Sequence, residues 1–77
     1  RPSADEKPYV FVSATENESK NGDWYFTCIL EDEDGDEIEV IAKGDLAFEV
    51  SQLEDDTDIL AVVAKRNNFN LLKALKV

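Results

Sequence analysis

Histidine is absent from this 77-residue sequence, and cysteine occurs only once, as Cys28. Without histidine the chain cannot carry a Ser-His-Asp or Cys-His catalytic site or a histidine metal site, and a single cysteine cannot build a zinc cluster. No stretch approaches the roughly 20 consecutive apolar residues of a membrane-spanning helix, and no hydrophobic signal segment is visible. We therefore expect a protein that works away from membranes in a reducing compartment, the cytoplasm or the nucleus.

Basic residues are scarce: 8 Lys and Arg stand against 18 Asp and Glu, which gives a net charge of −10. The charge is unevenly distributed, because residues 31–60 carry thirteen acidic side chains and one basic one, whereas residues 61–77 carry four basic side chains and no acidic ones. Hydrophobic residues make up 43% and aromatic residues 9%, which suits a folded core rather than a disordered tail. The length limits the chain to one small domain.

The chain divides into a short polar leader and one domain over residues 9–77. Residues 1–8 contain both prolines and show no apolar periodicity, so we expect a flexible leader in a chain that is a piece of a longer protein. Residues 9–12 are aromatic and β-branched, which predicts a first strand. The polar residues 15–23 predict a loop after it.

A β-hairpin is predicted over residues 24–42. Residues 24–30 alternate in a strand pattern, and Tyr25 and Thr27 share one of its faces. The opposite face holds four side chains that we expect in the core: Trp24, Phe26, Cys28 and Leu30. Asp34-Gly35 predicts a tight turn, because both residues tolerate positive φ, and residues 38–42 form the returning strand.

One short helix and two further strands complete the expected fold. Leu46, Val50 and Leu53 form one stripe of a short helix, with Asp45 as its N-cap. Residues 59–64 predict a buried strand, residues 65–68 a polar turn and residues 69–77 a last strand. This order predicts an all-β fold, a small five-stranded Greek-key barrel like the OB fold, with one short helix between strands three and four.

Several motifs resemble OB-fold nucleic-acid-binding domains of the anticodon-binding and single-strand-binding type. Residues 23–26 read Asp-Trp-Tyr-Phe, and Leu-Glu-Asp at 30–32, a turn glycine at 35 and the alternating segment 38–44 follow. Residues 58–72 resemble strand four, the next loop and strand five of those domains. The resemblance covers residues 8–77 and implies a ligand groove across strands two and three, between two flanking loops at residues 16–23 and 65–68.

The resemblance implies a single-stranded nucleic acid, most readily DNA, as the ligand. Cationic side chains would contact phosphates, Tyr25 or Phe69 would offer a stacking face, and asparagines, Asn70 among them, would bond base edges. The candidate contacts are Lys20, Tyr25, Thr27, Lys43, Lys65, Arg66, Asn68 and Phe69. The chain would then be a non-sequence-specific binding module of a larger replication, repair or processing protein.

The acidic composition supports an alternative. Glu37 and Glu39 share the face of Tyr25 and would repel phosphates, and residues 65–68 also suit an ordinary solvated turn. An acidic OB-fold domain could instead dock a basic protein partner and bind no nucleic acid. Both alternatives leave the oligomeric state open.

No enzymatic or metal chemistry is predicted. The many carboxylates lack any sign of a convergent pair, and neither a nucleophile nor a phosphate-binding glycine loop accompanies them. The acidic run at 31–37 fails the EF-hand spacing, because Leu30 falls at the first ligand position and Ile41 at that of the final glutamate. We therefore expect no catalytic residue, no metal and no cofactor, and an inert, buried Cys28.

Overall fold

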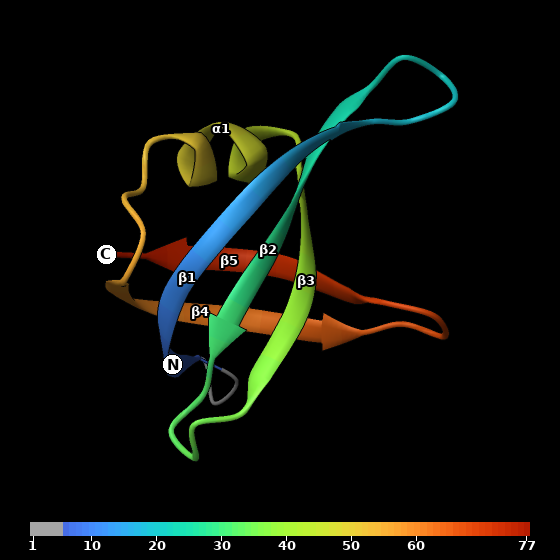
Figure 1. Cartoon of the computed structure of the whole chain (residues 1–77). Helices are drawn as coiled ribbons and strands as arrows, with labels where there is room; N and C mark the ends of the chain where they lie inside the picture. The colour runs from blue at the N-terminus through green and yellow to red at the C-terminus, as the bar shows by residue number, and fades with distance from the viewer. Residues whose placement is uncertain (1–5) are drawn as a thin grey trace.

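The computed structural model describes residues 6–77 and contains a closed barrel in the strand order β1-β2-β3-β5-β4 (Figure 1). Neighbouring strands are antiparallel except for β3 and β5, which are parallel. The elements are β1 (Lys7–Glu18), β2 (Trp24–Glu31), β3 (Glu37–Lys43), α1 (Asp45–Ser51), β4 (Thr57–Lys65) and β5 (Asn70–Lys76). This confirms the predicted OB-like barrel with one short helix between the third and fourth strands.

A β-bulge in β1 lets this strand pair with two partners. Its first half pairs with β4 and the later part pairs with β2, and the register with β2 shifts between Phe11 and Ser13. One extra residue, Val12, therefore changes which side of the strand faces the barrel: Phe11 points inward before the bulge and Ala14 after it.

The bounds of β1 correct two predictions. The strand continues to Glu18, so the predicted loop over 15–23 is reduced to its second half. Lys7 and Pro8, assigned to the leader, belong to β1, where Pro8 lies beyond the residues paired with β2 and can lack a backbone N–H. The other leader residues, 1–5, lie outside the described part of the chain.

The turns after β1 and β2 share one geometry. In each, the first residue donates its N–H to the fifth (Ser19 to Asp23 at 2.8 Å, Asp32 to Asp36 at 2.9 Å). Its carbonyl accepts from the glycine at the fourth position, which has φ of +86° or +83°. These are three-residue loops with a left-handed glycine. The tight turn predicted at Asp34-Gly35 is present, and of these two residues only Gly35 has a positive φ.

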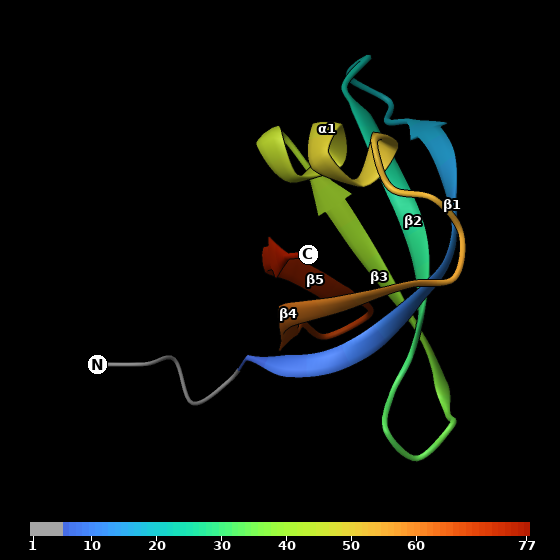
Figure 2. The same ribbon diagram turned by 90° about the vertical axis from the view of Figure 1, so that its left-hand side faces the viewer.

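The core lies inside the barrel and under α1, which covers one end of it (Figure 2). Ala47 and Val50 of the helix are buried, while Leu46 and Leu53 pack partly against the core.

The helix N-cap is Gly44, which forms no side-chain cap, so the prediction of Asp45 as the N-cap is wrong; Asp45 is the first helical residue. No helix of the described residues is long and apolar enough to cross a membrane. The largest fully buried side chains are Phe11, Leu30, Val40 and Cys28.

The barrel closes through a short parallel contact between β3 and β5. Only Val40 with Asn70 and Ile41 with Leu71 are in register, and the Asn70 side-chain amide donates to the Glu39 carbonyl at 3.0 Å. Asn70 therefore helps to close the barrel, and its amide nitrogen is already engaged where we expected a contact with bases.

Candidate nucleic-acid interface

The outer face of β1, β2 and β3 arranges side chains in rows across the strands. One row joins Asn17, Tyr25 and Lys43, and the next joins Thr15, Thr27 and Ile41. Because successive side chains of a strand alternate between the two faces, Tyr25 and Thr27 point away from the core, as predicted.

A groove of about 720 Å³ lies where these rows meet the turn after β1 and the loop before β5. Its most exposed aromatic rings are Trp24, at 56% exposure, and Phe69, at 43%. A pair of exposed rings in one groove is unusual for side chains that a protein otherwise buries, and such faces can stack on bases. The lining residues are Ser19, Asn21, Asp23, Trp24, Tyr25, Ile41, Lys43, Gly44 and Phe69.

Lys43 and Phe69 are in direct contact within the groove. The Lys43 ammonium lies over the Phe69 ring, 5.9 Å from its centroid, which is a cation–π distance. Lys43 ends β3, and Phe69 immediately precedes β5, the strand paired with β3, so the charge and the ring come from neighbouring segments. The contact orients a positive charge beside a flat apolar surface, the combination that holds a phosphate next to a stacked base.

Thr27 lies one row farther from the turn and takes part in a hydrogen-bond network. The Asn17 side-chain amide donates to Thr27 Oγ1 at 2.9 Å and to the Thr15 carbonyl at 3.1 Å. Thr27 Oγ1 accepts this bond, so the hydroxyl hydrogen of Thr27 is not engaged in it and can point outward.

The flanking loops carry the other predicted contacts. Lys20 lies in the turn between two lining residues, Ser19 and Asn21. Lys65 ends β4, and Arg66 donates its N–H to the Phe69 carbonyl at 2.8 Å, which closes the β4–β5 hairpin over two exposed asparagines, Asn67 and Asn68. The structure thus places three of the eight predicted residues in the groove lining, whereas the other five lie outside it, Thr27 one row away and the rest in the β1–β2 or β4–β5 hairpin. The three are Tyr25, Lys43 and Phe69.

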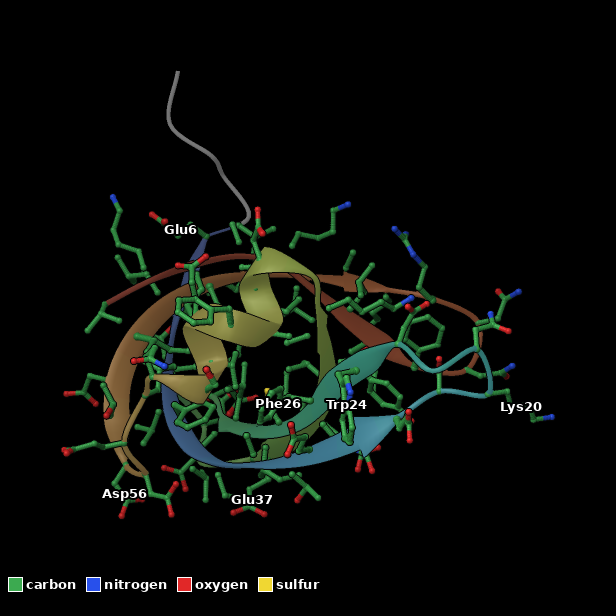
Figure 3. All side chains as sticks on the ribbon, turned by 90° about the horizontal axis from the view of Figure 1, so that it is seen from above. Glu6, Lys20, Trp24, Phe26, Glu37 and Asp56 are labelled. Atoms are coloured by element: carbon green, nitrogen blue, oxygen red, sulfur yellow. The ribbon has the colours of Figure 1, made fainter. Side chains whose placement is uncertain are left out.

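Trp24 corrects the prediction that it belongs to the core. It has the same strand parity as Phe26, but it lies on the part of the β1–β2 hairpin that extends toward Lys20, farther from the barrel centre (Figure 3). Its cross-strand partner is Glu18. Glu18 is exposed as well, so this end of the hairpin lies in water together with the indole.

Ser19, Asn21 and Ile41 also line the groove without having been predicted to do so. Ile41 is in register with Thr27 and therefore lies on the same face. The alternation that placed Thr27 on this face could have predicted Ile41 there as well. Ser19 and Asn21 belong to the turn after β1, whereas the sequence pattern alone predicted a longer loop.

Acidic side chains reduce the positive charge of this face. Asp23 lies in the groove, and Glu39 precedes Ile41 by two positions on the same side of β3. Glu37 is farther away, in register with Glu31 next to the β2–β3 turn. The predicted repulsion of phosphates by Glu37 and Glu39 therefore acts on the part of the strands away from the groove, whereas Lys43 lies in the groove itself.

The aspartates of the β2–β3 turn form a compact cluster, and the hydrogen bonds of the turn explain it. Carboxylate oxygens of Asp32, Asp34 and Asp36 lie within 4.8 Å of one another. Asp32 Oδ1 accepts backbone N–H bonds from Asp34 at 2.9 Å and from Asp36 at 3.0 Å. These bonds stabilise the turn, and we assign no metal to the cluster.

Comparisons with protein-family models, with curated proteins and with solved structures found no match to the chain.

Proposed function

We propose that the chain is a binding module for single-stranded nucleic acid, with DNA as the first ligand to test, within a larger replication, repair or processing protein. The observation that carries the proposal is the groove that combines exposed Trp24 and Phe69 with Lys43. It crosses β2 and β3 between the β1–β2 and β4–β5 loops, which is where OB-fold barrels bind oligonucleotides.

The proposed binding mode divides the work between rings and cations. Bases stack on Trp24, Tyr25 or Phe69, since every base has a flat face and stacking of this kind needs no particular sequence. Four of the chain's eight basic residues lie in the groove or in the loops beside it, and these would contact phosphates: Lys20, Lys43, Lys65 and Arg66. Asn68 would donate to base edges.

The rest of the surface keeps the affinity modest. With a net charge of −10, the chain as a whole repels a polyanion. Four phosphate contacts would give a slope of log K against log salt near −3, because each contact contributes about −0.7 for a single strand. We expect a dissociation constant of about 1–100 μM at physiological salt.

Trp24 provides the test, because it is the only tryptophan of the chain. A short oligothymidylate should quench its fluorescence on binding, and the quench should fade as salt is added. The double variant Lys65→Ala/Arg66→Ala should bind at least about tenfold more weakly. Lys73→Ala/Lys76→Ala removes the same charge from exposed positions outside the groove lining and should change affinity by less than about twofold. Equal losses in both variants would refute the groove as the binding site.

The second candidate function is docking of a basic protein partner without nucleic-acid binding. The thirteen acidic side chains of residues 31–60 favour it. Absence of any quench or gel shift at about 100 μM oligonucleotide, the weak limit of ordinary non-specific binding, would favour this function over the first.

A further inference from the structure

A second groove, of about 410 Å³, lies near the opposite end of β2. It is formed where the start of β1, the end of β2 with its turn, the start of β4 and the end of β5 come together. In Figure 1 the β2–β3 turn and the β1–β2 turn lie at opposite ends of the molecule. The two grooves share no lining residue.

The second groove has an apolar part of its lining, called its floor below, that is open to water. Leu60 is 37% exposed and Val77 is 81% exposed, and both line it. Pro8 is in register with Leu60, and both are exposed side chains on the outer side of their strands. Exposed apolar side chains that gather in one concave place, rather than singly, are typical of surfaces that bind a partner.

Carboxylates surround this floor. Val10 is in register with Glu31 of β2 on one side and with Asp58 of β4 on the other, so one row holds an apolar side chain between two acidic ones. Neighbouring strands are about 4.8 Å apart, which separates the two acidic residues by about 10 Å across the row. Asp32 and Glu33 add two more carboxylates, and Lys76 is the single basic residue among the described lining residues.

The apolar floor and the carboxylates around it together indicate which kind of ligand the groove can bind. Four carboxylates against one ammonium repel phosphate, so the groove does not extend the nucleic-acid site. A small cation would leave the apolar floor exposed. A peptide satisfies both features if two cationic side chains flank an apolar one, because the apolar side chain can cover the floor while the cations meet the rim.

We infer that this groove docks a basic segment of a partner protein, of the pattern Lys/Arg-x-apolar-x-Lys/Arg. In an extended chain, alternate residues share one side, and the two outer residues of the pattern are about 13 Å apart. Flexible Lys or Arg side chains reach from that spacing to Glu31 and Asp58, with the apolar side chain over Val10 and Leu60.

The test is a titration of the ¹⁵N-labelled chain with the synthetic peptide Lys-Ser-Leu-Ser-Lys, blocked at both ends and followed by amide shifts. Shifts should concentrate at the start of β1, at the start of β4 and around Glu31. The peptide Lys-Ser-Ser-Ser-Lys, which has the same charge and lacks the apolar residue, should bind more weakly. Equal binding of the two peptides, or shifts spread over the whole surface, would mean unspecific attraction of a cation and would overturn the inference.

Matched variants locate the charge effect. Glu31→Gln/Asp58→Asn should weaken peptide binding about fivefold, as expected for two partly exposed ion pairs. Glu49→Gln/Glu54→Gln removes the same charge at exposed positions in and after α1 and should leave binding nearly unchanged. Equal weakening by both pairs would contradict the site. Oligothymidylate at saturation should not displace the peptide, so failure of this inference is distinguishable from failure of the proposed function; displacement would place the peptide in the first groove instead.

Discussion

The Lys43 ammonium lies 5.9 Å from the centroid of the Phe69 ring, although 26 positions separate the two residues in the chain. Phe69 immediately precedes β5, the strand paired with β3, and both residues line the groove together with Trp24 and Tyr25. One side chain offers charge and the other offers an apolar face, so replacing each should affect binding in a different way.

Phe69→Leu should weaken oligothymidylate binding without changing its salt dependence. The loss should amount to about 1–3 kcal/mol, the contribution of one stacked base. Lys43→Gln should weaken binding and reduce the salt slope by about 0.7, because it removes one phosphate contact. Fluorescence titrations at several salt concentrations measure both quantities. A reduced slope for Phe69→Leu, or an unchanged slope for Lys43→Gln, would contradict these roles.

Trp24→Ala should cost little stability, because the indole is mostly in water. We expect a change in the free energy of unfolding below about 1 kcal/mol, the range of exposed positions. Phe26→Ala, on the same strand parity but packed against the core, should cost about 2–3 kcal/mol or more. Urea unfolding followed by circular dichroism measures both variants. A large loss for Trp24→Ala would restore the original assignment of Trp24 to the core.

The barrel and the face of Tyr25 were predictable because alternation over β2 and β3 is regular. With the hairpin in place, the face of Tyr25 and Thr27 was fixed by parity, and so was the position of Lys43 in the same row. The pairing of Lys43 with Phe69 required the closure between β3 and β5, which no local pattern reports. The resemblance to OB-fold domains predicted a closed barrel, but not the contact between Lys43 and Phe69.

The position of Trp24 was not predictable from alternation alone. Parity says which side of a strand a residue faces, but not whether anything covers that side. In β1 the bulge at Val12 places Glu18 opposite Trp24, and the apolar run around Val12 hides the bulge in the sequence. A usable signal did exist for the end of β1, since residues 19–23 (Ser-Lys-Asn-Gly-Asp) repeat the turn pattern of residues 32–36 (Asp-Glu-Asp-Gly-Asp).

The shared turn geometry predicts how Gly35 responds to substitution. Its φ is +83°, and a Cβ built there has no atom within 4 Å, so the cost of a side chain comes from the backbone alone. Gly35→Ala should lower the free energy of unfolding by about 1 kcal/mol, and Gly35→Asn by less, because Asn tolerates the left-handed region better. Urea unfolding compares the two variants with the unaltered chain. Equal cost of Ala and Asn would argue against a backbone origin.

Cys28 predicts a loss of stability in alkaline solution. The side chain is 1% exposed, and burial raises the pKa of its thiol from 9.0 to about 11, because the thiolate loses hydration in the core. Below pH 9 the thiol is neutral in the folded and the unfolded chain, so it contributes no pH dependence. Between about pH 9 and 11 only the unfolded chain ionises, and the free energy of unfolding falls by about 2–3 kcal/mol through this group.

Other residues titrate in the same range, so the measurement is a difference between two proteins. Urea unfolding from pH 8 to pH 11 should show a steeper decline for the unaltered chain than for Cys28→Ala, which has no thiol to ionise. The variant starts from a lower stability at pH 8, since it leaves a small cavity next to Leu30 and Val40 in the core cluster. The two curves should therefore converge as the pH rises. Parallel curves would mean that the thiol ionises equally well in the folded chain, which a fully buried Cys28 does not permit.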